Sequence, residues 1–239
     1  MKKEEKKLEK KSPKFRMIEV TLKGETPLLM HKDNIEGADE LARWTKAPEN
    51  KGKSKAGDDR TPAWTWVNYC YHDGKNLVID ADNLMSMLRD AGAKMKHPVS
   101  RGSLKTQAQS LLVVQGLGWE FRNNGKLIPW PEIEELKSEL DFDKHLEAVK
   151  KMGFSLSLKR ASIKSGFDSK KHIRVRPMFE QWETKGKILV MDSELFTDEV
   201  IQELFNTAGI FVGLCDWRPG SKSSPGHFGC FTASFKEVK

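Results

Sequence analysis

The sequence predicts an α+β protein with a split β-α-β, or ferredoxin-like, core. Residues 15–24 alternate apolar and polar side chains, which is typical of a half-buried strand. Near the other end, an apolar strand at 186–195, a helix at 198–209 and a final alternating strand follow one another, which is half of such a fold. Hydrophobic residues make up 38% of the 239-residue chain, enough for the core of one elaborated domain.

Two segments fall outside this regular pattern. Residues 1–14 are almost all charged, and we expect a solvated tail there. The stretch from about 38 to 63 is rich in Lys, Gly, Pro and Asp, a composition that buries little surface. Long loops of this kind inside compact domains are usually functional or disordered. We therefore expect a single domain over 15–239 with a flexible basic finger inserted at about 38–63.

The next elements are indicated by turn and capping residues. Residues 64–80 predict a strand pair around the turn Asp73-Gly74. A helix then begins at an aspartate cap near Asp80 and ends at Gly92, where a glycine commonly terminates a helix.

The second half of the chain repeats these signals. Residues 110–122 predict another strand, and the acidic amphipathic segment 131–152 predicts helix. The helix near the C-terminus has Thr197 as its cap and Gly209 at its end, and residues 210–213 predict a short extended piece.

The composition excludes several classes of protein. A net charge of +7 favours a polyanionic partner, although the placement of the charge decides how specific this is. No stretch approaches the ~20 apolar residues of a transmembrane helix, and the charged start lacks a signal peptide's apolar segment, so we expect a cytoplasmic protein. The cysteines Cys70, Cys215 and Cys230 lack the spacing of a disulfide scaffold or zinc site, and neither GxxxxGK[ST] nor GxGxxG occurs. We expect neither a metal nor a cofactor.

The strongest candidate for a binding surface is a basic cluster between Lys159 and Arg176. Arg174 and Arg176 are two residues apart on a predicted strand, so both guanidinium groups point to one face and suit bidentate phosphate contacts. The alternative is a solvated surface loop. The predicted nucleic-acid contacts in this cluster are Lys159, Arg160, Lys164, Lys170, Lys171, Arg174 and Arg176.

Two further segments carry similar chemistry. A second basic patch follows the helix that ends at Gly92, and two such patches fit a groove that tracks a nucleic-acid backbone. The glycine loop (residues 213–229) has glycines that let the main chain approach a ligand, and Trp217 and Phe228 can stack on bases or belong to the core. The predicted contacts here are Lys94, Lys96, Arg101 and Lys105 in the patch and Trp217, Arg218, Lys222 and His227 in the loop.

Parts of the sequence resemble a known family. GSKSSPGHFGCFTASF, a small-residue loop that runs into G-x-aromatic-G-x-aromatic, is similar to the C-terminal glycine loop of the RAMP superfamily. These are the ferredoxin-like, RRM-like RNA-binding subunits of CRISPR effector complexes. IEVTLKGETPLLM resembles the first strand and the following Pro-Leu turn of that superfamily. The RVRPMF…W and AG-x3-GLCDWRP segments are also similar to those of uncharacterised phage-borne proteins.

The resemblance implies a backbone-type subunit. Such a protein binds a single strand of RNA or DNA with little base readout and multimerises along it. The stretch at 38–63 then resembles the finger with which such subunits clasp the strand or the adjacent protomer. Whether the strand is RNA or DNA stays open, and so does dependence on a guide.

Two alternatives also stay open. Some RAMP-like proteins are endoribonucleases that use a histidine as general acid or base, for which His31 and His227 are candidates. The other alternative is a non-enzymatic phage assembly or interaction protein that binds an acidic partner. The sequence gives neither histidine a partner, and its aspartates follow no nuclease spacing, so we expect a protein that is not an enzyme.

Overall fold

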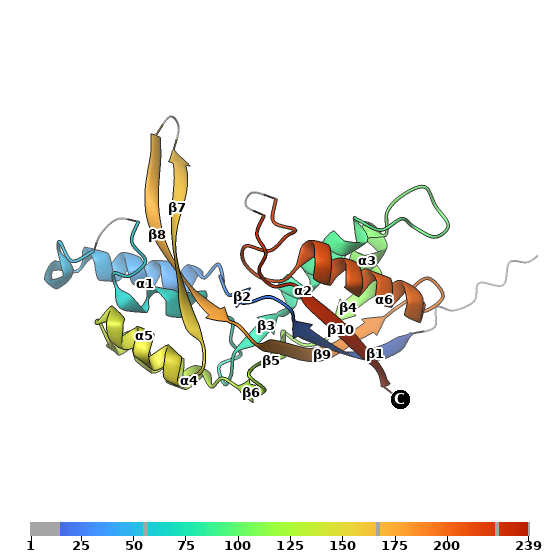
Figure 1. The fold of residues 1–239 in the computed structure, drawn as a ribbon, viewed down its shortest axis with the longest axis horizontal. Helices are drawn as coiled ribbons and strands as arrows, with labels where there is room; N and C mark the ends of the chain where they lie inside the picture. The colour runs from blue at the N-terminus through green and yellow to red at the C-terminus, as the bar shows by residue number, and fades with distance from the viewer. Residues whose placement is uncertain (1–14, 55–56, 166–167, 223–224, 239) are drawn as a thin grey trace, which may run out of the picture.

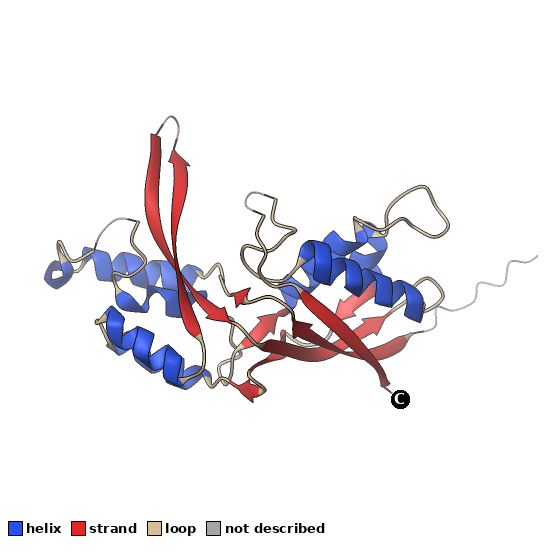
Figure 2. Cartoon of the chain, in the orientation of Figure 1, coloured by secondary structure: helices blue, strands red, loops and turns tan. Residues whose placement is uncertain are grey.

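The computed structural model describes residues 15–54, 57–165, 168–222 and 225–238, with residues 162–165 and 168–170 described by their backbone alone. Two parts lie side by side: a sheet with helices on one face, and a helical part from which a long hairpin projects (Figure 1). Helices and strands occur in both parts (Figure 2). The prediction of an α+β fold is confirmed, and both sheets are antiparallel.

The larger sheet has the first strand near its middle. Strand β1 lies between β10 and β9, and the order continues from β9 to β5 and β3, while β4 also pairs with β9 and β6 with β5. The last strand, β10, therefore lies beside the first. The strands of this sheet are β1 (Arg16–Gly24), β3 (Val78–Asp80), β4 (Leu112–Val114), β5 (Gly118–Asn123), β6 (Lys126–Leu127), β9 (Trp182–Val190) and β10 (Phe231–Val238).

Strand β1 shows why the sheet is covered on one face. Ile18, Val20 and Leu22 are buried, as the alternation in the sequence predicts. Glu19 points to the other face, where its carboxylate forms an ion pair with the amine of Lys185 at 3.0 Å. An antiparallel sheet with one apolar and one polar face needs helices on the apolar face only.

That apolar face is covered by helices α2 (Ala81–Gly92), α3 (Lys105–Leu111) and α6 (Asp198–Thr207), as Figure 1 shows. Two of the predicted caps are confirmed. The Asp80 carboxylate accepts a hydrogen bond from the backbone of Asp82, and the Thr197 hydroxyl accepts one from the backbone of Val200.

The second part contains α1 (Ile35–Lys46), η1 (Pro48–Asn50), η2 (Ala63–Tyr69), α4 (Trp130–Glu134), η3 (Glu135–Ser138) and α5 (Phe142–Lys151). A smaller sheet joins it to the rest, in the order β2 (Leu28–Leu29), β8 (Asp168–Phe179), β7 (Ser155–Ser165). Strands β7 and β8 form the projecting hairpin. Inside this part, the Trp66 indole donates a hydrogen bond of 3.0 Å to Nδ1 of the fully buried His145.

The stretch from 38 to 63 is not the predicted structureless loop. Helix α1 and η1 occupy its first half, and Asp58 forms a parallel bridge with Ile173 of β8. Asn34 caps α1 by accepting a hydrogen bond from the backbone of Gly37, a local signal that the polar composition obscured. The element that projects from the molecule is the β7–β8 hairpin.

Three smaller predictions of strand are also corrected. Residues 63–69, at the start of the predicted strand pair, form the 3-10 helix η2 instead of a strand, and almost all residues of η2 are buried. Residues 110–122 contain the end of α3 and two strands, and 210–213 lie largely in a π-helical turn, η4 (Ala208–Val212). Gly209 lets this turn lie close to β10, since any side chain at this position would collide with the carbonyl of Phe231.

None of the helices in the described ranges is both long enough and apolar enough to cross a bilayer.

Candidate nucleic-acid interface

A cleft of about 290 Å³ lies between the base of the β7–β8 hairpin and the glycine loop. It collects residues from three segments that are distant in the sequence: β2 and the residues after it, the β7–β8 hairpin, and the glycine loop. Seven of its ten lining residues have polar or charged side chains. The lining residues are Leu29, His31, Ser157, Lys159, Ala161, Arg174, Arg176, Asp216, Trp217 and Ser221.

Arg176 anchors the floor of the cleft. Its side chain is buried, and its guanidinium donates hydrogen bonds to the carboxylates of Asp59 at 3.1 Å and Asp216 at 3.2 Å. The same guanidinium lies over the ring of Tyr69, with 4.3 Å between the guanidinium carbon and the ring centroid. Arg176 therefore neutralises two carboxylates and holds three chain segments together, and few of its donors are left for a ligand.

His31 completes this floor. An Arg176 nitrogen lies 3.2 Å from its Nε2, and since a guanidinium only donates hydrogen bonds, Nε2 accepts and Nδ1 carries the proton of the neutral ring. That Nδ1 lies 3.5 Å from Asp216 Oδ2. Burial acts to raise the pKa of Asp216, but the hydrogen bonds from the His31 ring and the Trp217 backbone and the charge of Arg176 outweigh it, so the pKa lies below its usual value.

The predicted basic cluster divides between the two faces of the hairpin. Arg174 and Arg176 both line the cleft, which confirms that they share a face. Lys159 is the cross-strand partner of Arg174 and also lines the cleft. Arg160 and Lys171 alternate with them and therefore point to the opposite face. The side chains of Lys164 and Lys170 lie outside the described residues.

Lys159 and Arg174 are the cations of the cleft that a ligand can reach. Lys159 is exposed, and the described part of the chain gives its amine no ion-pair partner. Arg174 is half-exposed and donates one hydrogen bond of 3.2 Å to Asp59, which leaves the rest of its guanidinium open to the cleft.

Trp217 of the glycine loop lines the cleft on the side opposite the hairpin. Trp217 has a φ of 52°, a left-handed conformation that is costly for a residue with a bulky side chain. Its ring is stacked at 6.3 Å, centroid to centroid, with that of the buried Phe228. Trp217 is thus a half-buried platform, while Phe228 belongs to the interior.

The glycines of this loop have a different role from the predicted one. A side chain on Gly226 would collide with the carbonyl of Trp217, and one on Gly229 with the carbonyl of Leu214. These glycines let the loop pack against its own main chain, which fixes Trp217.

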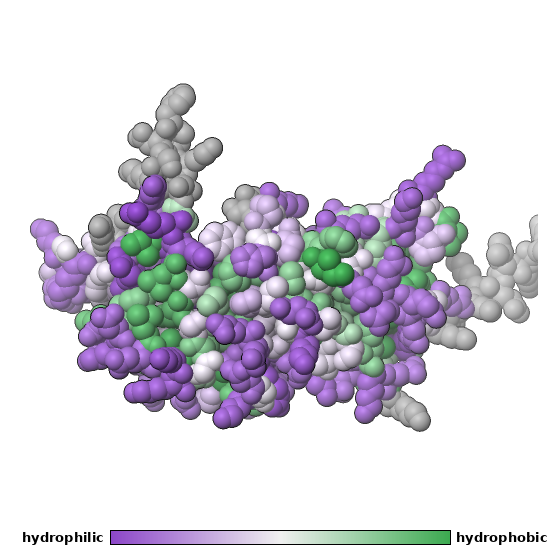
Figure 3. All heavy atoms as spheres, viewed as in Figure 1, coloured by the Kyte–Doolittle hydropathy of each residue, from purple (hydrophilic) through white to green (hydrophobic). Residues whose placement is uncertain are grey.

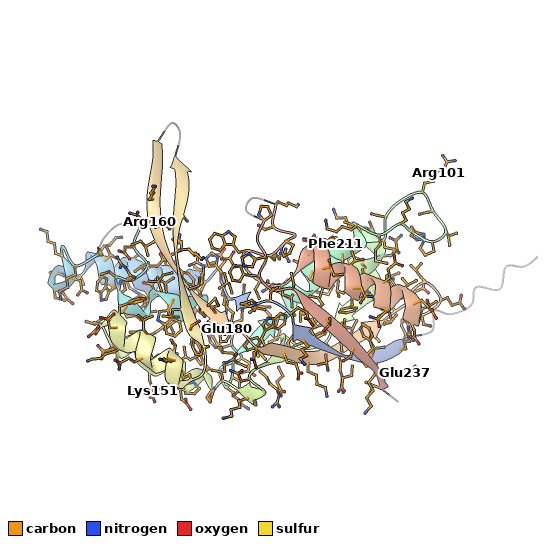
Figure 4. All side chains as sticks on the ribbon, viewed as in Figure 1. Arg101, Lys151, Arg160, Glu180, Phe211 and Glu237 are labelled. Atoms are coloured by element: carbon orange, nitrogen blue, oxygen red, sulfur yellow. The ribbon has the colours of Figure 1, made fainter. Side chains whose placement is uncertain are left out.

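The other predicted contacts lie outside the cleft. Arg218 turns away to α2, where its guanidinium donates to Asp90 at 3.3 Å. His227 is exposed and stacks on Phe228 at 4.4 Å, and Lys222 is exposed beside Ser221. The second basic patch lies on the loop between α2 and α3, at the other end of the molecule from Arg160, as the label of Arg101 shows in Figure 4. Its exposed members are Lys94, Lys96, Arg101 and Lys105.

Sequence reasoning missed the acidic half of this site. Asp59 and Asp216 were weighed only as metal ligands or nuclease carboxylates, whereas they orient the arginines. Asp59 precedes a basic residue in what looked like a mobile insertion, so no local signal identified it. Within the described ranges, no group of three or more His, Cys, Asp or Glu residues is arranged to hold a metal ion.

Neither a protein-family model nor a curated protein sequence matches this chain.

Proposed function

We propose that the chain is a single-stranded nucleic-acid-binding protein and that the strand enters the cleft between the β7–β8 hairpin and the glycine loop. The observation that carries this proposal is the meeting of Lys159 and Arg174 with Trp217 around one cleft. Two accessible cations can contact the phosphates of a nucleic-acid backbone, and a half-exposed indole can stack on the face of a base. This pairing is how proteins hold single strands without reading their sequence.

The proposed core is ferredoxin-like. In the larger sheet the last strand lies beside the first, the sheet is antiparallel, and helices cover one face. This arrangement supports the split β-α-β topology and the resemblance to the RAMP superfamily, whose members bind along a strand as multimers. Assembly along the strand belongs to the same proposal.

Little base readout is expected in the cleft. The groups that face it from the hairpin are cations and small side chains, which contact phosphates and sugars, and Trp217 offers a ring face that accepts any base. The affinity is therefore expected to depend on salt more than on sequence.

The test compares Lys159 with Lys171. Both are exposed lysines of the same hairpin, but Lys159 lines the cleft and Lys171 points to the opposite face. Each is replaced by Gln, and binding to a labelled homopolymer is followed by fluorescence anisotropy over a salt series. We expect Lys159→Gln to weaken binding to every homopolymer and to lower the log–log salt slope by about 1, and Lys171→Gln to change neither.

Equal effects of the two variants would contradict binding in the cleft. Binding to the homopolymer that does not weaken with salt would contradict contact with the phosphate backbone. Arg176 is unsuitable for this test, because removing it leaves buried Asp59 without its main partner and disturbs the fold.

The endoribonuclease alternative has one observation in its favour, since His31 lies in the cleft beside Asp216. Both ring nitrogens of His31 are already engaged, which is the arrangement of a structural histidine rather than of a free acid or base. We therefore expect labelled RNA to remain intact with the unaltered protein. Cleavage that His31→Ala abolishes and His227→Ala preserves would overturn this expectation.

A further inference from the structure

Two exposed apolar side chains lie on the surface between the cleft and the second basic patch. Ile210 and Phe211 belong to η4, the π-helical turn at the end of α6, and Phe211 is 57% exposed. Figure 3 shows this small apolar area surrounded by more hydrophilic residues. Phe211 lies between Arg160 on the hairpin and Arg101 on the α2–α3 loop, along one side of the molecule (Figure 4).

The turn that carries Phe211 is hydrogen-bonded to the glycine loop, and through that loop it is linked to α2. The carbonyl of Val212 accepts a hydrogen bond of 2.9 Å from the backbone of Gly220 in the glycine loop. The same loop is tied to α2 through Arg218 and Asp90, and α2 leads directly into the second basic patch. Hydrogen bonds thus connect the turn that carries Phe211 with the glycine loop and the glycine loop with α2.

We infer that Phe211 is a second stacking residue for the bound strand, which leaves the cleft at Trp217, crosses Phe211 and reaches the α2–α3 loop. This inference rests on the proposed function and extends it, because it joins the two basic segments into one track. An exposed aromatic ring between cations is the combination that holds unpaired bases and their phosphates.

The size and the surroundings of the apolar area favour a strand over a protein partner. A specific protein interface buries about 800 Å² on each partner around an apolar centre. Ile210 and Phe211 supply only two large apolar side chains, and the loops on either side carry exposed cations such as Lys222 and Lys96.

The experiment uses two lengths of the same labelled homopolymer with the full chain. We choose one oligonucleotide of roughly four nucleotides for the cleft alone and one of roughly sixteen for the whole track, the two ends of the range of footprints of single-strand-binding folds. We expect Phe211→Ala to weaken the longer complex by roughly 5- to 150-fold, the loss of one stacked base, and to leave the shorter one unchanged. Phe211→Trp should retain the affinity for the longer oligonucleotide, whereas Phe211→Leu should behave like Phe211→Ala.

Phe15 provides the matched control. It is 60% exposed, against 57% for Phe211, and it directly precedes β1 instead of lying on η4. Phe15→Ala should leave binding of both lengths unchanged.

Each failure has its own meaning. Equal binding of the longer oligonucleotide by the Phe211→Ala variant and the unaltered protein overturns the track while the proposed function stands. Loss of binding at both lengths on Lys159→Gln, with no effect of Phe211, confines the strand to the cleft. A Leu variant that binds as tightly as the unaltered protein, or a dimer in light scattering that Phe211→Ala dissociates, assigns the apolar area to protein contact and overturns the inference.

Discussion

Replacing Asp59 by Asn should destabilise the fold more than any surface charge change. The Asp59 carboxylate is 8% exposed and accepts hydrogen bonds from Arg174, Arg176, the Tyr69 hydroxyl and the backbone of Val175. The substitution keeps the volume of the side chain, so it makes no cavity, and it removes the negative charge that two guanidinium groups share.

The magnitude follows from what Arg176 retains. Removing one partner of a buried ion pair typically costs ~3–5 kcal/mol, because the other charge stays buried and unpaired. Arg176 keeps Asp216 at 3.2 Å, so the loss should lie at the low end of that range. We expect the free energy of unfolding to fall by about 3 kcal/mol and Tm by roughly 6–12 °C, at 2–4 °C per kcal/mol for a chain of this size.

Urea unfolding followed by tryptophan fluorescence measures this directly. The control is Asp198→Asn, because Asp198 also accepts a short hydrogen bond from an arginine, Arg16, but is 84% exposed. A surface pair of this kind contributes at most about 1 kcal/mol. If Asp59→Asn costs no more than Asp198→Asn, Asp59 does not organise the floor of the cleft and the reasoning is refuted.

Three further outcomes are expected. The pKa of Asp216 lies below its ordinary value of 3.8, so Asp216 contributes stability that is fully present above pH 3.8 and is lost as the pH falls through the lower pKa of the folded state. Asp216→Asn should therefore flatten the pH dependence of unfolding in that acid range. Gly226→Ala should displace Trp217 and weaken strand binding in anisotropy, whereas Gly102→Ala, whose side chain would make only an ordinary contact with the Ser100 hydroxyl, should have no effect; equal binding by both variants would show that the loop does not position the indole. Burial raises the pKa of the Cys70 thiol, so a thiol reagent should modify Cys70 only on unfolding, and rapid labelling of it in the native protein would be inconsistent with the core described above.

Local signals in the sequence predicted some of the regular elements correctly. The strand at β1 followed from alternation, and the helices α2 and α6 followed from periodicity and from the caps Asp80 and Thr197. Each of these signals lies within a few residues of the element it specifies, so a single sequence is enough to find it.

The cleft was only half predictable for the opposite reason. The spacing of Arg174 and Arg176 showed that they share a face. No local signal showed that the carboxylates of Asp59 and Asp216 form ion pairs with the guanidinium of Arg176. Those carboxylates lie 117 and 40 residues away in the sequence. Helix α1 was missed because, among its residues, only Gly37 is fully buried, so its composition looks like that of a loop.

The contacts that build the cleft span most of the chain, and this has a consequence for folding. Arg176 meets His31 across 145 residues and Asp59 across 117, so the cleft forms only when these distant segments have already come together. Such long-range closure is slow and comes late, and the hairpin alone carries no complete site. A ligand that recognises the cleft therefore binds only the folded chain, and by mass action it stabilises the whole molecule against unfolding. An oligonucleotide that occupies the cleft should therefore raise the Tm of the whole chain, and the fluorescence of any buried tryptophan can follow this shift.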